Sequence, residues 1–201
     1  SSFFFYGVPE KGIPYLYLSD ATQGVHLRNN LPDSTMVRQL ERSTAFPCPI
    51  MLASSFDPEL AFRYAEAVGE ECRAGGIEVL LGPGLNIARN SQCGRNFEYY
   101  SEDPLLSGKC GAAMVRGIQS QGVGTSVKHF AANNQESMRL QNDARVSQRA
   151  LREIYLRGFE IAVKEGRPWT VMSSYNRING PYTQESRELL TTVLRDEWGY
   201  E

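Results

Sequence analysis

The sequence predicts an α/β protein with a parallel sheet. Short apolar runs rich in β-branched and aromatic residues alternate with longer amphipathic segments, which is the rhythm of consecutive βαβ units. The amphipathic segments carry helix start signals, such as Asp57-Pro58, Asp103-Pro104 and Ser147, and most end at glycine. The connections between parallel strands are expected to be right-handed. Both a (β/α) barrel and an open doubly wound sheet fit this pattern.

Five short apolar runs are predicted to be strands: residues 13–18, 50–53, 77–81, 124–127 and 169–172. Four segments are predicted to be helices, beginning near positions 57, 103, 147 and 185 and ending near 75, 122, 166 and 198. The polar residues 29–45 are expected to be an excursion outside the core. The rhythm also predicts a strand after Gly199, where the 201-residue sequence has only two residues left.

The composition excludes several classes of function. The net charge of -2 gives no basic footprint for nucleic acid, and no apolar run approaches the roughly 20 residues of a membrane span. The four cysteines lack metal-ligand spacing, so neither zinc nor another metal is expected, and they are expected to be reduced core residues. No glycine-rich nucleotide-binding motif occurs, so no cofactor is expected.

The segment 77–108 is the densest in functional residue types. It reads as a strand, a loop of about twenty residues and the start of a helix, and a loop of this length in a compact domain is usually functional or disordered. Its aromatic residues and glycines argue against disorder.

Polar or ionisable side chains follow the predicted strands. They are Asp20, Arg89 with Arg95, Lys128 with His129, and Tyr175 with Asn176. Because the carboxyl ends of parallel strands meet at one edge, these side chains are expected to converge there. The mixture of charged groups, amides and nearby aromatic rings suits a neutral ligand rich in hydroxyl groups, such as a sugar.

Eight stretches of the sequence carry a resemblance to a known family. They are SSFDPELA, GPGLNIARN, CGRNFEYYSEDPLLSG, VRGIQSQGVG, VKHFAANNQE, RALREIYLRGFEIAVKE, MSSYNRING and LLTTVLRDEWGY. Together they resemble the first domain of glycoside hydrolase family 3, in its β-glucosidase branch. The resemblance implies a TIM-like (β/α) barrel, of which residues 1–201 hold about five strands, with the rest of the barrel and the following domain absent. It also implies retaining hydrolysis of β-glucosides or β-linked oligosaccharides, and favours a periplasmic or secreted location.

The resemblance implies five substrate-binding residues. Asp20 is similar to the carboxylate that holds sugar hydroxyls far from the cleaved bond, and Arg95, Lys128 and His129 are similar to other residues that bind the sugar ring. Tyr175 resembles the tyrosine beside the nucleophile. The sequence departs from the family after Asp20, where Ala-Thr-Gln-Gly replaces the usual Gly-Pro pattern.

No catalytic residue is expected within the chain. The family's nucleophile is an aspartate expected just after Glu201, and its acid/base comes from a later domain, so the chain alone is expected to be inactive and to need the remainder of the same enzyme. The carboxylates near the strand ends have structural interpretations. Asp103 is a helix N-cap with Glu102 beside it, whereas Glu98 and Glu136 orient Arg95 or backbone donors.

Three alternatives remain open. The N-acetylhexosaminidase branch of the same family is disfavoured, because residues 131–134 lack its second histidine. A β-xylosidase or another β-glycosidase of the family fits the same motifs. The third alternative is a non-catalytic carbohydrate-binding or scaffolding piece that needs a partner chain to complete the barrel.

Overall fold

The structure is a computed structural model of the chain, and it describes residues 4–20, 22–26 and 42–201. Its main sheet has five strands in the order β1-β2-β3-β4-β6. These strands are β1 (Phe4–Phe5), β2 (Leu16–Asp20), β3 (Val79–Leu81), β4 (Gly124–Phe130) and β6 (Thr170–Ser173). The last four pair in parallel, and β1 pairs antiparallel with β2. The α/β class and the mainly parallel sheet are therefore confirmed.

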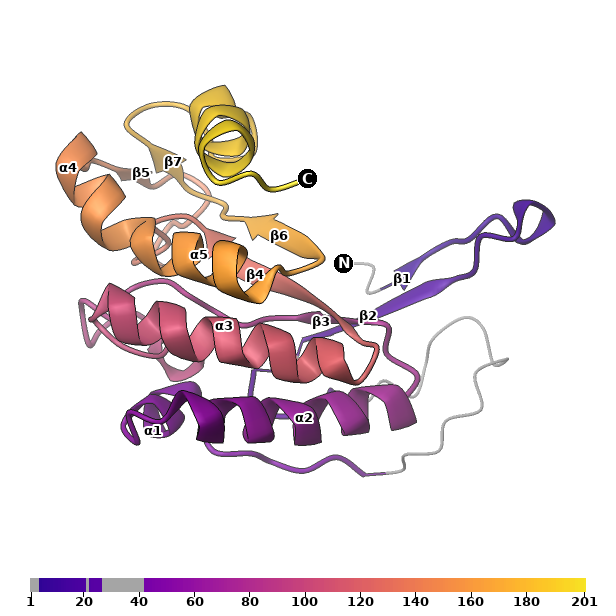
Figure 1. The fold of residues 1–201 in the computed structure, drawn as a ribbon. Coiled ribbons are helices and arrows are strands. Elements are labelled where there is room, and N and C mark those ends of the chain that lie inside the picture. Colours follow the sequence, from indigo (N-terminus) through magenta and orange to yellow (C-terminus); the bar gives the residue numbers. More distant parts are fainter. Residues whose placement is uncertain (1–3, 21, 27–41) are drawn as a thin grey trace.

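Helices pack against one face of this sheet (Figure 1). Helix α2 (Pro58–Ala74) lies beside α3 (Pro104–Ser120), and α3 contacts α5 (Arg157–Ile161). The predicted helix starts are confirmed, since Asp57 accepts hydrogen bonds from the Glu59 and Leu60 amides and Asp103 from the Leu105 amide. Each cap satisfies backbone donors that the first helical turn cannot pair.

The predicted helix from Ser147 to Gly166 is continuous but irregular. It comprises α4 (Gln148–Ala150), the π-helical turn η3 (Leu151–Tyr155), α5, and a second π-helical turn, η4 (Ala162–Gly166). The last predicted helix is also observed, as the π-helical η5 (Glu188–Glu197). Two short 3₁₀ helices, η1 (Pro9–Lys11) and η2 (Asn96–Glu98), and the paired strands β5 (Asp143–Ala144) and β7 (Arg177–Ile178) complete the elements.

The prediction of a strand at residues 50–53 is wrong, because these residues form helix α1 (Pro49–Ala53). Pro49 stands at the first helical turn, where its missing N–H costs nothing. Leu52 and Ala53 are buried while Ile50 and Met51 are exposed, so only one side of helix α1 packs against the rest of the protein. A four-residue apolar run does not distinguish a strand from a buried helix. The fifth strand of the sheet is instead β1, which the sequence pattern did not indicate.

Most of the predicted excursion at 29–45 lies outside the described residues, and residues 42–45 contain neither helix nor strand.

Close packing between α2 and α3 depends on a glycine. A Cβ atom on Gly117 would lie 2.5 Å from both the Ala65 Cβ and the Phe62 carbonyl oxygen. The two helices can therefore approach each other only with glycine at this position. This contact holds α2 against α3, and α3 in turn contacts β4, whose carboxyl end carries the candidate site.

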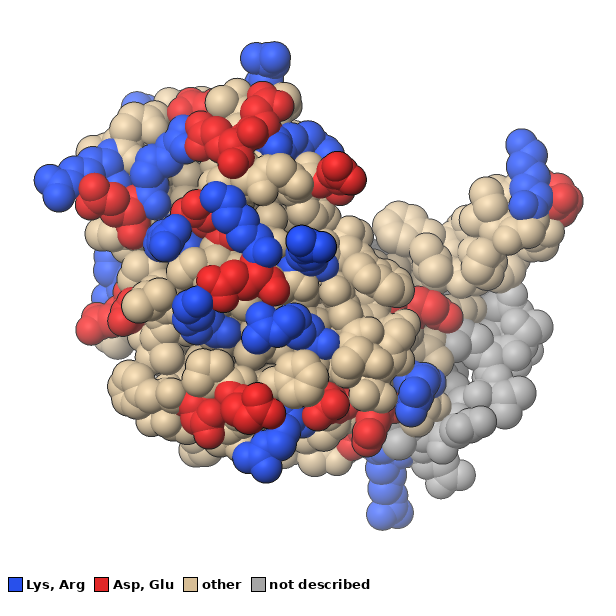
Figure 2. Space-filling view, viewed as in Figure 1, with Lys and Arg blue, Asp and Glu red and all other residues tan. Residues whose placement is uncertain are grey.

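The helix-covered face carries charges of both signs, interspersed across its surface (Figure 2). Several of them form exposed ion pairs, such as Lys109 with Glu165 on neighbouring helices. Across the described ranges, no helix is both long and apolar enough to span a membrane. All four cysteines are free, and three of them are buried, as expected for core thiols.

Candidate functional site

The site forms around the end of β4, which is buried along its whole length. Lys128 and His129 stand near its carboxyl end, and both are 3% exposed. The loop after β3 fixes this end, because the Lys128 amide donates to the Pro83 carbonyl at 3.0 Å and the Lys128 carbonyl accepts from the Leu85 amide at 2.6 Å. The backbone that carries Lys128 and His129 is thus held on both sides of Lys128.

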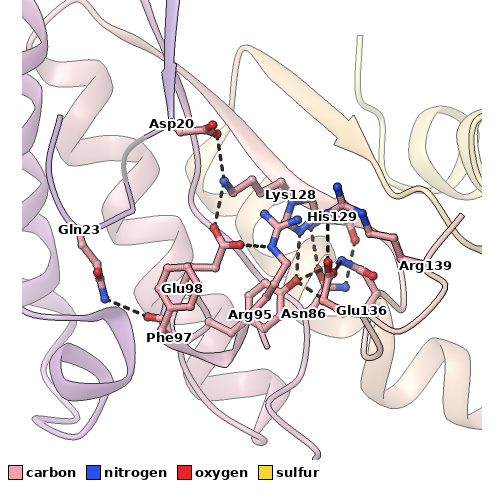
Figure 3. A network of polar contacts seen from close by, with 12 residues as sticks. Asp20, Gln23, Asn86, Arg95, Phe97, Glu98, Lys128, His129, Glu136 and Arg139 are labelled. Carbon is pink, nitrogen blue, oxygen red and sulfur yellow. Dashed lines mark hydrogen bonds and ion pairs between the residues drawn. The ribbon is translucent and has the colours of Figure 1, made fainter. Parts of the chain in front are cut away.

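A four-residue ion network lies at this end of the sheet (Figure 3). The Lys128 Nζ is 3.0 Å from Glu98 Oε2 and 3.7 Å from Asp20 Oδ1. Arg95 Nε donates to the other Glu98 oxygen. Asp20 ends β2, Lys128 belongs to β4, and Arg95 and Glu98 belong to the long loop after β3. Three segments far apart in sequence therefore meet, as the parallel topology predicts.

Most of the charged groups in this network are buried, so each needs an oppositely charged partner within the network. The side chains of Lys128 and Glu98 are each 3% exposed, and Arg95 is also largely covered, whereas Asp20 is 48% exposed. Burial alone would lower the pKa of Arg95, but the Glu98 carboxylate outweighs it and the pKa is raised. Two cations and two anions balance one another. Asp20 is the member of the network that faces solvent.

His129 is held by two neighbours. Asn86 exchanges two hydrogen bonds with its backbone, and the Tyr99 hydroxyl lies 3.1 Å from His129 Nδ1. Burial, reinforced by the positive charges of Arg95, Lys128 and Arg139, lowers the pKa of His129 to about 2. The imidazole is therefore neutral at ordinary pH and offers one N–H donor and one nitrogen acceptor.

Tyr175 joins the site only through a chain of contacts. Its ring is 45% exposed and lies 4.8 Å from the Arg139 guanidinium carbon. Arg139 pairs with Glu136 at 3.0 Å, and Glu136 accepts from Asn133, whose amide is 3.4 Å from the Tyr99 hydroxyl. Tyr175 thus stands at the end of the polar network that begins at His129.

Two of the residues expected to converge at the strand ends make their contacts outside the ion network. Arg89 donates to the Tyr155 hydroxyl at 2.8 Å and lines a separate cavity of about 200 Å³. Asn176 is buried and donates to the carbonyl oxygens of Ala131 and Arg177, so its role is structural. Glu98 does orient Arg95, as expected, whereas Glu136 pairs with Arg139.

A pocket of about 470 Å³ opens over the ion network. Asp20, Arg95 and Lys128 line it, so three of the five predicted substrate-binding residues share one cavity. The rest of its wall comes from the loop after β2, from residues 43–45, and from Phe97 and Glu98. A cavity of this size with a few convergent polar groups is typical of a small-molecule site.

Sequence reasoning missed Asn86 and Tyr99. Asn86 is a polar residue between the buried Leu85 and Ile87, and this is the signal that could have revealed it, because a buried amide requires partners. Tyr99 is fully buried, and burial raises its pKa well above the usual value, so it keeps its proton. Both residues act on His129 rather than on the pocket.

Parallel strands with helices on one face and a polar pocket at their carboxyl ends are typical of a barrel-type α/β fold (Figure 1). A family model described as the glycosyl hydrolase family 3 N-terminal domain matches residues 20–201. The chain belongs to this family. Its sheet is accordingly an incomplete TIM-like barrel, as expected.

Solved structures agree with this assignment. β-Glucosidase 3B from Thermotoga neapolitana, solved in complex with glucose, superposes with a TM-score of 0.91 at 52% identity, covering 98% of this chain and 27% of the other. A family 3 β-glucosidase from Bifidobacterium adolescentis superposes with a TM-score of 0.89 at 50% identity, covering all of this chain and 28% of the other.

Curated relatives include more than one activity. An exo-α-(1→6)-L-arabinopyranosidase of Bifidobacterium breve is 54% identical over 97% of this chain and 26% of its own length. Thermostable β-glucosidase B of Acetivibrio thermocellus is 49% identical over 95% of this chain and 25% of its own length. The chain thus spans about a quarter of the curated relatives that it matches.

Proposed function

We propose that this chain supplies the sugar-binding residues of a retaining β-glucosidase. The observation that carries the proposal is the ion network of Asp20, Lys128, Glu98 and Arg95 beneath a 470 Å³ pocket at the carboxyl ends of parallel strands. Family membership gives the reaction class, glycoside hydrolysis. The residues that would hold the sugar are Asp20, Arg95, Lys128 and His129, with Tyr175 at the periphery.

The proposed binding side chains provide both hydrogen-bond acceptors and donors for the hydroxyl groups of a sugar. The exposed oxygens of Asp20 can accept hydrogen bonds from two adjacent hydroxyls, while Lys128 and Arg95 can donate to hydroxyl oxygens. Neutral His129 can do either. Because Glu98 and Asp20 together balance the charges of Arg95 and Lys128, the pocket favours a neutral polar ligand over a free anion.

We further propose that both catalytic carboxylates come from polypeptide outside these residues. Retaining hydrolysis needs two carboxyl groups about 5–5.5 Å apart, one attacking and one protonating. The acids near the network have other roles: Glu98 forms two ion pairs, Glu136 pairs with Arg139, and Asp103 caps α3. Residues 1–201 would then form the first part of a longer barrel domain, inactive on their own.

A second candidate is an α-L-arabinopyranosidase. The Bifidobacterium breve relative with that activity is 54% identical to this chain, above the 49% of the Acetivibrio thermocellus β-glucosidase. L-Arabinopyranose lacks the hydroxymethyl group of glucose and differs from it in the configuration of one hydroxyl, so the two activities are separable with simple substrates.

The test is turnover of chromogenic aryl glycosides by the polypeptide expressed from its complete gene. A β-D-glucoside, a β-D-xyloside and an α-L-arabinopyranoside would be compared at equal concentration, together with residues 1–201 alone. We expect the glucoside to give the highest kcat/KM and the short chain to be inactive. Preference for the arabinopyranoside would select the second candidate, and turnover by pure residues 1–201 would place the nucleophile inside them. Absence of any turnover would contradict the proposal.

A further inference from the structure

The pocket changes character from its base to its mouth. At the base, Lys128 and Glu98 are each 3% exposed and paired with each other. Towards solvent, Asp20 is 48% exposed and Phe97, the residue before Glu98, is 54% exposed. A large aromatic ring thus lines the same cavity as the charged cluster but lies in contact with water. An apolar ring beside the opening of a polar pocket is unexplained by the binding of a sugar at the base.

Phe97 is also held from the opposite wall. Gln23, in the loop after β2, donates from its Nε2 to the Phe97 carbonyl at 3.4 Å (Figure 3). The Gln23 backbone is itself fixed, because its carbonyl accepts from the Phe46 amide at 2.9 Å. His26 is tied back to β2, because the Ser19 hydroxyl is 3.1 Å from both its amide nitrogen and its carbonyl oxygen. The backbone is therefore held at Gln23 itself and at His26, on the side of Gln23 away from Asp20.

We propose that Phe97 is a specificity-determining residue that covers the ring of the leaving group, and that Gln23 is its positioning residue. The proposal rests on the proposed function, because it assumes that the sugar to be cleaved occupies the base of the pocket around Asp20 and Lys128. The group attached to that sugar then points to the mouth. A flat ligand face, either an aryl ring or the C–H face of a second pyranose, is the partner that an exposed aromatic ring recognises.

This assignment gives Gln23 a defined task. It lies in the loop after β2, three residues beyond Asp20, and its amide reaches the Phe97 carbonyl across the pocket. The Gln23 side chain donates to the Phe97 backbone carbonyl and does not itself contact the leaving group. Loss of that hydrogen bond should loosen the ring without removing it, and the effect should be smaller than removal of the ring.

The test separates the leaving group from the sugar. Phe97→Ala and Phe97→Leu would be made in the polypeptide expressed from its complete gene, and KM measured for an aryl β-glucoside, for cellobiose and for methyl β-glucoside, with glucose as a competitive inhibitor. We expect KM to rise about 3- to 10-fold for the aryl glucoside and cellobiose in both variants. The KM for methyl β-glucoside and the inhibition constant of glucose should be unchanged. Phe97→Tyr should behave as the wild type.

Matched controls isolate the ring and the amide. Phe5→Ala removes another exposed phenylalanine, 63% exposed on β1 and absent from the pocket lining, and should change none of the four constants. Gln23→Glu keeps the shape of Gln23 but replaces the donor with an acceptor that repels the Phe97 carbonyl. It should raise KM for the aryl glucoside and cellobiose by less than Phe97→Ala does.

Two results would overturn the inference. If Phe97→Leu leaves all KM values unchanged, Phe97 does not contribute to binding of the leaving group. The same conclusion follows if it changes the KM for methyl β-glucoside and the inhibition constant of glucose as much as the other constants. If Gln23→Glu weakens glucose itself, Gln23 contacts the sugar and is not a positioning residue. A wild-type polypeptide that neither cleaves a glucoside nor is inhibited by glucose would instead remove the proposed function on which this inference rests.

Discussion

Asn86 and His129 exchange two hydrogen bonds across the site. The His129 amide donates to Asn86 Oδ1 at 2.9 Å, and Asn86 Nδ2 donates to the His129 carbonyl at 3.0 Å. Both residues are buried, and they lie 43 positions apart in the sequence. Asn86 thus supplies the pairing that a neighbouring strand would otherwise give, at a place where the register between β4 and β6 is irregular.

Replacing Asn86 with alanine should destabilise the protein. The substitution leaves a buried N–H and a buried C=O of His129 without partners, which should cost about 2–4 kcal/mol. Denaturant unfolding of the polypeptide expressed from its complete gene would measure this. Asn90→Ala is the control, because among the described residues the Asn90 side chain accepts a hydrogen bond only from the exposed Gln92 amide. A loss no larger than that of Asn90→Ala would mean that the His129 backbone finds other partners.

The depressed pKa of His129 should make stability depend on pH. Its pKa is about 2 in the folded protein, compared with about 6.5 in an unfolded chain. As the pH falls below about 6.5, the unfolded state gains a proton that the folded state does not accept. Stability should therefore decrease with falling pH, by about 1.4 kcal/mol per pH unit once the unfolded imidazole is charged.

The second histidine of the chain provides the control for this prediction. His129→Gln should reduce the pH dependence of unfolding between pH 6.5 and 5, before most carboxylates titrate, and His26→Gln, at an exposed residue, is the matched control substitution. The expected observation is a shallower slope in the His129 variant than in the wild type. Equal slopes in the wild type and the His129 variant would show that His129 becomes protonated in the folded protein.

Substitutions of Lys128 and Asp20 should affect stability and glucose binding to different extents, although both residues belong to the same ion network. Lys128→Met removes one partner of a buried ion pair and should cost about 3–5 kcal/mol of stability. Asp20 is half exposed, so Asp20→Asn should cost less than about 1 kcal/mol. Under the proposed function, Asp20→Asn should nevertheless weaken glucose binding about 10- to 100-fold, because the charge-assisted hydrogen bonds proposed between Asp20 and the sugar would be lost. Calorimetric binding and thermal unfolding would measure the two effects, with Glu165→Gln on the helical surface as the control. Glucose binding that is indifferent to Asp20→Asn would remove Asp20 from the site.

The cysteines should differ in their reaction with a thiol reagent. Burial raises the pKa of Cys72 to about 12 and that of Cys110 to about 11, and only the thiolate reacts. Cys48 is partly exposed. Brief treatment of the native protein with iodoacetamide at pH 8, followed by peptide mass spectrometry, should find Cys48 modified well ahead of Cys72 and Cys110. Similar rates for all three would mean that the helices carrying Cys72 and Cys110 open readily.

The helices were predictable from the sequence because their signals are local. Asp57, Asp103 and Ser147 each accept a hydrogen bond from a backbone amide two or three residues ahead. Because these contacts involve neighbouring residues only, the sequence pattern is enough to predict them. The run at 50–53 was not predictable, because four apolar residues fit a strand and a helix equally. Strand β1 has two residues, which is too short for any periodicity to be visible.

The site was predictable to the extent that topology determines it. Asp20, Arg95 and Lys128 converge because parallel strands end at the same edge, which the strand-helix alternation already implies. The positions of Arg89 and Tyr175 depend on how loops fold over Tyr155 and Arg139, and no periodic pattern records those contacts. The pairing of Asn86 with His129 joins two loop-proximal residues across the sheet, so only three-dimensional structure reveals it.

The isolated 201-residue chain should be unstable or aggregate. In the described part of the molecule β6 ends the sheet, and its Val171, Met172 and Ser173 are only partly covered. An edge strand with half-exposed apolar side chains offers unpaired backbone groups to other chains, and a closed barrel would remove this edge. Light scattering coupled to size-exclusion chromatography should therefore find oligomers or aggregates of residues 1–201, whereas the polypeptide expressed from its complete gene stays soluble. A 22.5 kDa monomer with a cooperative melting transition would contradict the prediction, because it would mean that the sheet is stable with β6 at its edge.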